Sequence, residues 1–391
     1  MNYYQRALEL KEETIKHRRY IHENAETGLD LPKTTAYVMK TLEECGLQPQ
    51  MCGHGVIATL GHGGKTILLR ADMDALPMKE ESGEPFACPS GHAAHACGHD
   101  FHAAILLSVA KMLKEQEDQL QGTVAFMFQP AEEIFLGARD MIDAGLFEKT
   151  KPDAALALHV MAGKMNHGIL MYNNTGTMMS SVDGFRIHIQ GKGCHGAYPQ
   201  DGIDPIAIGV HIHLALSELI AHEADPAHSC VLSIGHFEAG KAPNIIPDTA
   251  MMEGTLRTKN EEARAKLVKR IHEICDLTAK RYGGSATIEV LSDMNVLECD
   301  PQTTTEMVEY ARELSIPELV EYPGITANAS DDFAMITSRI PATYVNVSAG
   351  FTDERGQYPI HHPKVRFNED VCPIGSSLLA HCAARWLEEH K

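Results

Sequence analysis

TILLRADMD, at residues 66–74, is the stretch that decides the fold. Its first half is a short apolar run, and its second half places one basic and two acidic residues directly after that run. Three more short runs rich in Val, Ile, Leu and Ala lie at residues 123–128, 154–158 and 342–347. Runs of this kind, alternating with amphipathic stretches, are typical of buried parallel strands joined by crossover helices. We therefore predict an α/β fold with a mostly parallel sheet flanked by helices.

The rest of the chain supplies helices and a second, different pattern. Predicted helices are residues 4–23, 34–45, 101–115, 303–314 and 371–389. Between residues 183 and 291 the order becomes strand, helix, two strands, helix and strand. Those six elements are residues 184–190, 204–222, 229–238, 249–258, 261–282 and 286–291. This βαββαβ order is a known two-layer unit, so we predict that residues 183–292 form an inserted domain between residues 1–182 and 293–391.

Composition and charge exclude several classes of protein. The chain has 34 basic and 53 acidic residues and a net charge of −19, which argues against a surface for nucleic acid or anionic lipid. Charged residues occur throughout residues 1–13, and no later stretch is expected to be long enough to span a bilayer. A typical apolar run, residues 103–110, is far shorter than the ~18 residues of a membrane span. Ten scattered cysteines without a secretion signal are expected to be reduced. We therefore predict a soluble, cytoplasmic protein.

Polar clusters follow the predicted strands. Residues 70–74 come after the first strand, residues 129–133 after the second, and His159 closes the third. HACGHD, at residues 95–100, immediately precedes a predicted helix. Ligands of an open parallel sheet gather beyond the carboxyl ends of its strands. The convergence of Cys, His, Glu and Asp at this edge therefore predicts a metal site.

Cys97 and His99 alternate around a glycine. In an extended or tightly turned backbone both side chains can therefore face the same point, which suits two ligands of one metal cluster. A cysteine thiolate can also bridge two ions. Sulfur combined with imidazole and carboxylate favours Zn²⁺ and its neighbours over Mg²⁺ or Ca²⁺.

Glu132 and Glu133 are consecutive, so their side chains diverge and are expected to have different functions. One can bind a metal ion while the other remains free as a base. A metal lowers the pKa of its bound water toward about 7. A nearby carboxylate can then take the proton from that water and later deliver one to a leaving amine. This chemistry hydrolyses an amide without a covalent intermediate.

Each of these residue types also has an ordinary structural role. A pair of glutamates is most often part of a solvated helix face, and a lone cysteine is most often a small buried apolar residue. Most of the 22 histidines are expected to be surface or core residues, among them His54, His62, His211, His213, His222 and His228. The joint placement of cysteine, histidines and glutamates at strand ends is what favours the metal site.

Several motifs make this sequence resemble the dinuclear metallopeptidase superfamily. They are RADMDALP (70–77), HACGHD (95–100), FQPAEE (128–133), GKGCHGAYP (191–199), PNIIPD (243–248), GTLR (254–257) and HHPKVRFNED (361–370). They occur in the family's order over nearly the whole chain. More closely, they resemble the amidohydrolase branch of hippurate hydrolases, N-acetyldiaminopimelate deacetylases and plant indoleacetyl-amino-acid hydrolases. The resemblance implies a zinc-exopeptidase-like catalytic domain and an inserted lid and dimerisation domain.

The same resemblance implies two divalent transition-metal ions, which could be zinc, manganese, nickel or cobalt. The implied ligands are Cys97, His99, Glu133, His159 and His361. Glu132 is the implied general base. His361, rather than His362, matches the ligand position when counted back from residues 368–370. Asp74 matches a carboxylate that orients a ligating group.

Three residues of the inserted domain match functional positions of the family. His195 matches a histidine that polarises the scissile carbonyl in the neighbouring subunit, which implies a homodimer formed through the inserted domain. Asn244 and Arg257 match substrate contacts, and the planar guanidinium of Arg257 suits a free carboxylate. The alternatives are that Arg257 is an ordinary exposed charge and that His195 only orders its own loop. The flanking Gly193 and Gly196 favour a functional loop at His195.

The predicted function is metal-dependent hydrolysis of the amide bond of small N-acyl-amino acids. The alternative enzyme is a metallo-dipeptidase or aminopeptidase, because sister branches use the same metal centre. A cysteine hydrolase is disfavoured because Cys194 and His195 point to opposite faces of an extended segment. A metal-binding sensor would not need Glu132 as a base. The sequence leaves open the acyl group, the amino acid, the physiological metal and the bridging ligand.

Overall fold

The computed structural model describes residues 1–391, which form two compact units. The first unit contains Met1–Met178, Glu298–Thr326 and Asp331–Lys391. The second contains Met179–Leu297 and the short segment Ala327–Ser330. The second unit therefore interrupts the sequence of the first, and each unit has its own buried apolar cluster.

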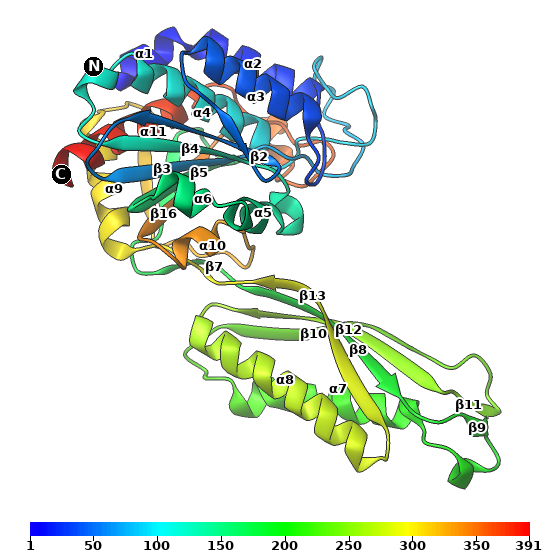
Figure 1. Ribbon diagram of the computed structural model, residues 1–391. Coiled ribbons are helices and arrows are strands. Elements are labelled where there is room, and N and C mark those ends of the chain that lie inside the picture. Colours follow the sequence, from blue (N-terminus) through cyan, green and yellow to red (C-terminus); the bar gives the residue numbers. More distant parts are fainter. The chain divides into compact units, whose positions relative to one another are not determined.

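The first unit is built on an eight-stranded sheet (Figure 1). In spatial order its strands are β1 (Gln50–Cys52), β2 (Gly55–Gly61), β4 (Thr123–Gln129), β3 (Thr66–Asp72), β5 (Ala154–Met161), β16 (Ala342–Ser348), β6 (Ile169–Tyr172) and β15 (Val320–Pro323). The four central strands, β4, β3, β5 and β16, run parallel to one another. Their carboxyl ends consequently share one edge of the sheet. The predicted α/β fold with a mostly parallel sheet is confirmed.

Helices cover this sheet on both faces. They are α1 (Tyr3–Glu9), α2 (Lys11–Glu23), α3 (Pro32–Glu44), α4 (His99–Lys114), α5 (Gly137–Asp143), α6 (Leu146–Thr150), α9 (Pro301–Glu313), α10 (Ala334–Thr337) and α11 (Val371–Glu389). Figure 1 shows α2 and α4 on one side of the sheet and α5 and α6 on the other. The single helix predicted over residues 4–23 is wrong at Leu10, where α1 ends and α2 begins. The Leu10 side chain is buried in the core at this junction.

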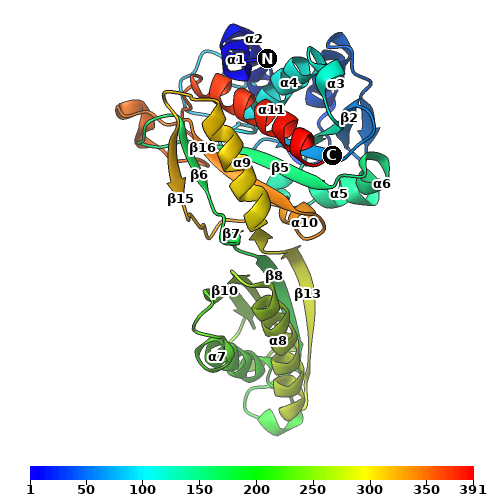
Figure 2. The ribbon, with the colours of Figure 1, turned by 90° about the vertical axis from the view of Figure 1, so that its left-hand side faces the viewer.

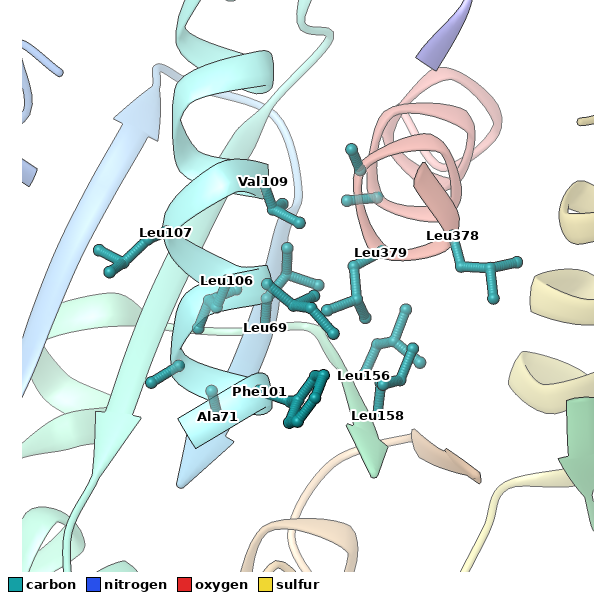
Figure 3. Packing of buried hydrophobic residues seen from close by; sticks show 14 of the residues in the cluster. Leu69, Ala71, Phe101, Leu106, Leu107, Val109, Leu156, Leu158, Leu378 and Leu379 are labelled. Carbon is teal, nitrogen blue, oxygen red and sulfur yellow. The ribbon is translucent and has the colours of Figure 1, made fainter. Parts of the chain in front are cut away.

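The core of the first unit is centred on α4, which is apolar on nearly all sides. A helix that is hydrophobic all round is a buried helix. α4 packs against α11 and against strands β3 and β5. Figure 3 shows Leu106 and Val109 of α4 in one apolar cluster with Leu69 of β3 and Leu379 of α11. This packing fixes α4, whose first residue, His99, belongs to the HACGHD motif.

The second unit has the predicted βαββαβ order. Its main elements are β8 (Val182–Gln190), α7 (Pro205–Glu223), β10 (Cys230–Ala239), β12 (Thr249–Thr258), α8 (Glu261–Arg281) and β13 (Ser285–Met294). The strands form an antiparallel sheet in the order β10, β12, β8, β13. Both helices contribute to one apolar cluster against this sheet (Figure 2). A small additional sheet pairs β9 (Cys194–His195) with β11 (Ile245–Ile246). Two further short strands are β7 (Thr177–Met179) and β14 (Leu297–Glu298).

α7 has an exposed apolar stripe. Ile206, Val210 and Leu214 are spaced by four residues and are all exposed, so they lie along one face of the helix. By length and apolar composition α7 is also long enough to cross a membrane, and only a third of that stretch is buried. The expectation that no segment reaches this length is therefore wrong for α7. One such helix is weak evidence for a membrane span, because an apolar stripe of this kind also marks protein interfaces.

Candidate metal centre

The predicted metal ligands of the first unit come together at the carboxyl edge of the sheet. Glu133 lies in a single 3₁₀ turn, Glu132–Ile134, shortly after β4 ends. His159 lies near the end of β5, and His361 lies in the segment that precedes α11. Cys97 lies just before α4, and His99 begins it. Four separate segments of sequence therefore contribute side chains to one place.

Gly98 explains how Cys97 and His99 reach the same point. Its φ is +98°, in the left-handed region that favours glycine. A Cβ atom at this position would lie 2.5 Å from Val160 Cγ2. The left-handed turn together with the close approach to Val160 of β5 requires glycine here. The turn presents the Cys97 thiol and the His99 imidazole to one site.

The ligand atoms form two overlapping groups. One group is Cys97, His99 and His159, and the other is Cys97, Glu133 and His361, with the ligand atoms of each group within 4.8 Å of one another. The Cys97 Sγ atom lies 3.4 Å from His159 Nε2 and 3.3 Å from His361 Nε2. Cys97 therefore belongs to both groups and lies where a thiolate could contact two ions.

Two buried atoms of the centre have no hydrogen-bond partner. They are His99 Nε2 and Glu133 Oε1, which lie 3.9 Å apart. A buried polar atom without a partner is costly, and a metal ion between these atoms would satisfy both. The mixture of thiol, imidazole and carboxylate suits Zn²⁺ and related transition metals. The residues present therefore fit a dinuclear metal centre.

Backbone carbonyls orient two of the imidazoles. His99 Nδ1 lies 2.9 Å from the backbone oxygen of Asp74, and His159 Nδ1 lies 2.7 Å from that of Val160. Because an N–H must donate to each carbonyl, the Nε2 atom of each ring is left free toward the other ligands. This is the usual way in which proteins orient metal-binding histidines.

Burial disfavours the charged forms of Cys97, Glu133 and His159, whereas for His99 burial is outweighed by nearby groups, the Asp72 carboxylate foremost, which hold its pKa well above its ordinary value. Burial raises the pKa of the Cys97 thiol and of the Glu133 carboxyl above their ordinary values. It also holds the pKa of His159 well below its usual range, so this imidazole is neutral and can bind a metal. Metal binding would favour the thiolate and release its proton.

His361 has a strained backbone. Its φ is +64°, which is uncommon for a residue other than glycine. The backbone N–H of His361 donates to the oxygen of Ala96 at 2.8 Å, which ties it to the segment that carries Cys97. The His361 side chain is about half exposed, at 51%. Strain of this kind is typical of functional sites.

Asp74 connects the glutamates to the metal ligands. Its carboxylate accepts the backbone N–H groups of Glu132 at 3.1 Å and Glu133 at 3.2 Å. The side chain of Glu132 is buried, with Oε2 3.8 Å from His99 Nε2. Burial and the nearby Asp331 carboxyl raise the pKa of Glu132 well above its ordinary value.

His102 also lies beside the site, and the sequence did not predict a role for it. It lies within 4.8 Å of Asp72 and His99 in a third cluster of potential ligands. However, its Nδ1 lies 2.5 Å from Asp72, and its Nε2 accepts the N–H of Val160 at 2.9 Å. Both ring nitrogens are occupied, so His102 supports His159 and Asp72 and is not a free ligand. Its spacing of three residues after His99 on a helix was the available signal.

A buried network of ion pairs beside Glu132 was also not predicted from the sequence. Arg70 donates to three carboxylates, Asp72 at 2.6 Å, Asp331 at 2.9 Å and Asp332 at 3.2 Å. All four side chains are almost completely buried. Arg70 lies in RADMDALP, but nothing in the sequence links this motif to residues 331 and 332.

Two of the predicted residues of the second unit lie together. His195 is in β9, and the backbone N–H of the next residue, Gly196, donates to the backbone oxygen of Asn244 at 2.8 Å. His195 is exposed, and its Nδ1 accepts the N–H of Ala197 at 3.1 Å. An accepting Nδ1 places the ring proton on Nε2. The Nε2–H of His195 is therefore left free to donate.

Arg257 lies apart from this pair. It is near one end of β12, whereas β9 and β11 adjoin the other end, next to Thr249. Arg257 lies eight positions along the strand from Thr249, which corresponds to roughly 25 Å at the usual rise per residue. Arg257 donates to Ser330 Oγ at 3.2 Å and to the Asn328 oxygen at 3.4 Å, neither of which is charged.

Comparisons with known proteins agree with this geometry. The profile of peptidase family M20/M25/M40 matches residues 68–385. The chain belongs to peptidase family M20. The M20 chain is 33% identical to an N-acetyl-L-cysteine deacetylase of Bacillus subtilis over 98% of its length and 90% of that protein. It is also 33% identical to a hippurate hydrolase of Campylobacter jejuni, over 99% and 100% of the two chains.

Further M20 relatives include a plant enzyme and solved structures. An IAA-amino acid hydrolase of Arabidopsis thaliana is 34% identical over 96% of this chain and 86% of its own. A dinuclear metal-binding M20 peptidase of Bacillus subtilis superposes with a TM-score of 0.81 at 31% identity, covering 97% and 99% of the chains. A protein from methicillin-resistant Staphylococcus aureus superposes with a TM-score of 0.92 at 28% identity, covering 100% and 99%. The resemblance predicted from the motifs is confirmed.

Proposed function

We propose that this M20 chain hydrolyses the amide bond of N-acyl-amino acids, with Glu132 as general base. The observation that carries the proposal is the pair of ligand groups that share Cys97, beside Glu132, which lies within 4.8 Å of His99 and Glu133 but belongs to neither of these two groups. The names of the relatives support the substrate class, because N-acetylcysteine, hippurate and IAA-amino acids are all acylated amino acids. Two divalent ions bound here would supply Lewis-acid polarisation and lower the pKa of water.

In this proposal the ions are held by Cys97, His99, Glu133, His159 and His361. Asp74 positions the segments that carry His99 and Glu133. Glu132 takes the proton of the attacking water and delivers it to the leaving amine. Its backbone is fixed by Asp74, so its carboxylate stays beside the ligand cluster. The set of candidate metals remains zinc, manganese, nickel or cobalt, since all accept this mixture of ligands.

We propose further that His195 acts in the partner subunit of a homodimer. The free Nε2–H can donate to the oxyanion that develops on the scissile carbonyl. His195 and Arg257 adjoin opposite ends of one sheet, so a substrate small enough to lie at one active site cannot touch both in a single chain. A site that uses both residues must draw them from two chains. The exposed apolar stripe of α7 supplies a surface for the dimer contact.

Arg257 and the partner subunit's Asn244, which lies beside the partner subunit's His195, are the proposed contacts for the polar end of the substrate. The guanidinium of Arg257 is held by a hydroxyl and a carbonyl but by no carboxylate. Its planar fork therefore remains available for the α-carboxylate of an N-acyl-amino acid. The cytoplasmic location predicted from the sequence stays a prediction.

The main alternative is a dipeptidase or aminopeptidase with the same centre. We would assay the metal-reconstituted protein on matched N-acetyl, N-benzoyl and free dipeptide substrates. The proposal expects turnover of acylated amino acids and little turnover of dipeptides with a free amino group. Preference for free dipeptides would establish the alternative. Loss of activity after thiol alkylation with metal content unchanged would instead favour a cysteine hydrolase.

A further inference from the structure

The segment that carries Glu132 and Glu133 is a closed loop. We define the glutamate loop as residues 130–137, between β4 and α5. The backbone N–H groups of Leu136 and Gly137 both donate to the Ala131 oxygen, at 3.1 and 3.3 Å. Ala131 and Phe135 have positive φ values of 53° and 57°. Such conformations are costly for residues other than glycine and persist only where surrounding contacts impose them.

The two ends of this loop, at Pro130 and Gly137, meet in a tightly closed neck. A Cβ atom on Gly137 would lie 1.6 Å from the backbone oxygen of Pro130, so only glycine allows the two ends to meet. The interior of the loop is held by Asp74, through the N–H groups of Glu132 and Glu133. Contacts within the loop and to Asp74 do not fix where the neck lies on the sheet.

Asp332 holds the neck from outside. One of its carboxylate oxygens accepts the Gln129 Nε2 amide at 2.5 Å, just before the loop. The other accepts the backbone N–H of Ala138 at 2.9 Å, just after the loop. The side chain of Asp332 is completely buried. A single carboxylate from a distant segment of the chain therefore bonds to both residues that flank the glutamate loop.

Arg70 fixes the carboxylate that holds the neck. It donates to Asp332 at 3.2 Å and, through Nε, to the Gln129 oxygen at 3.0 Å. The side chain of Gln129 is thereby bonded at both its oxygen and its nitrogen. Arg70 lies in β3, so these bonds fix the position of the glutamate loop relative to the central strands of the sheet.

We propose that Asp332 is a positioning residue that sets the place of Glu132 relative to the metal ligands. The proposal rests on the proposed role of Glu132 as general base. Asp332 acts through the backbone of the glutamate loop and through Gln129, and it touches neither substrate nor metal. Because small displacements of a reacting group can cost on the order of 100-fold in rate, the contact controls kcat.

Asp331 provides a matched control for Asp332. It is also buried, and the carboxylates of Glu132, Asp331 and Asp332 lie within 4.8 Å of one another. The Asp331 side chain bonds to Arg70 and to the N–H of Phe333, and neither bond reaches the glutamate loop. Removing its charge changes the electrostatics around Glu132 but leaves both ends of the loop held.

The test compares Asp332→Asn with Asp331→Asn. An amide at position 332 keeps the size of the side chain but replaces one acceptor oxygen by a donor, which opposes either Ala138 N–H or Gln129 and Arg70. We expect Asp332→Asn to lower kcat at least about 10-fold more than Asp331→Asn. KM and the metal content of both variants should stay close to those of the wild type. Equal losses of kcat in the two variants would overturn the proposal in favour of a charge effect.

A double variant separates positioning from general destabilisation. With Glu132→Gln already present, adding Asp332→Asn should change the residual kcat by less than about 2-fold, because the base that it positions is gone. A further loss as large as in the wild-type background would overturn the proposal. Full activity of Glu132→Gln alone, at full metal content, would instead reject the proposed function itself.

If Asp332→Asn does not fold, Gln129→Met carries the same test. Methionine keeps the length of the side chain and removes the Nε2 donor to Asp332. We expect a lowered kcat at unchanged metal content. An unchanged kcat in this variant would overturn the proposal.

Discussion

The Oδ1 atom of Asp74 accepts a hydrogen bond from the backbone N–H of Glu132 at 3.1 Å. The backbone oxygen of the same Asp74 lies 2.9 Å from His99 Nδ1. A single residue, two positions after the end of β3, therefore orients the imidazole of a proposed metal ligand with its main chain and holds the proposed base with its side chain. Asp74 thus links the proposed base directly to one proposed metal ligand, which gives a physical reason for a carboxylate at this position after the strand.

We predict that Cys97→Ser loses metal, because Cys97 belongs to both ligand groups and a hydroxyl is a far poorer ligand than a thiolate. The affinity for the ions should fall at least about 10-fold, as measured by elemental analysis after equilibration with a competing chelator. Cys45→Ser is the control, since Cys45 is a half-buried cysteine outside the centre. Full occupancy of both sites in Cys97→Ser would count against the ligand assignment.

We predict that the enzyme requires a free α-carboxylate on its substrate. Amidating that carboxylate should lower kcat/KM by at least about 10-fold, the loss of one charge-assisted hydrogen bond at 1.5 kcal/mol or more. The comparison of acid and amide should be repeated with Arg257→Met. If Arg257 is the contact, this variant should turn over the acid and the amide at similar rates. Equal turnover of both by the wild type would contradict the prediction.

We predict that His22 makes the stability of the protein depend on pH. Burial and Arg18 lower the pKa of His22, but Asp100 at 2.8 Å and Glu80 at 3.1 Å outweigh them and raise it above 6.5. Only the protonated ring can donate to both carboxylates. The neighbouring His95 has its pKa lowered to about 3 by burial and stays neutral.

A raised pKa in the folded state means that this stabilisation is fully present below pH 6.5, the unfolded value. It is lost as the pH rises through the folded value. Each unit of the shift corresponds to about 1.4 kcal/mol. Denaturant unfolding between pH 6 and pH 9 should therefore show a decline that is absent in His22→Gln. The same pH dependence in both proteins would show that His22 is not its source.

The sequence predicted most of the fold and the centre for specific physical reasons. The strands of the parallel sheet are continuous apolar runs, and their polar ends carry Glu132, Glu133 and His159. Arg70, Asp331 and Asp332 meet only because β3 lies beside the later segment in space, so no local pattern could reveal them. The exposed stripe of α7 was not predicted either. Isoleucine, valine and leucine on one face of a helix usually indicate a buried face, and only the structure shows that this face is exposed.

We predict that mixing two inactive variants restores activity if His195 acts in the partner subunit. His195→Ala and Glu132→Gln should each be nearly inactive alone. In a mixed dimer one active site combines Glu132 of one chain with His195 of the other, so up to about half of the native activity per mixed dimer should return. If the subunits are shown to exchange but activity does not recover, His195 acts within its own subunit.

Glu132→Gln tests the central claim most directly, because it separates the base from the metal ligands. We predict that the purified variant retains nearly all of its metal by elemental analysis while kcat on an N-acetyl-amino acid falls at least ~100-fold. Asp74 would still hold the backbone of residue 132, so the substitution removes only the proton-accepting group. A variant that loses metal and recovers activity when excess ions are added would contradict the account and would exchange the roles of Glu132 and Glu133.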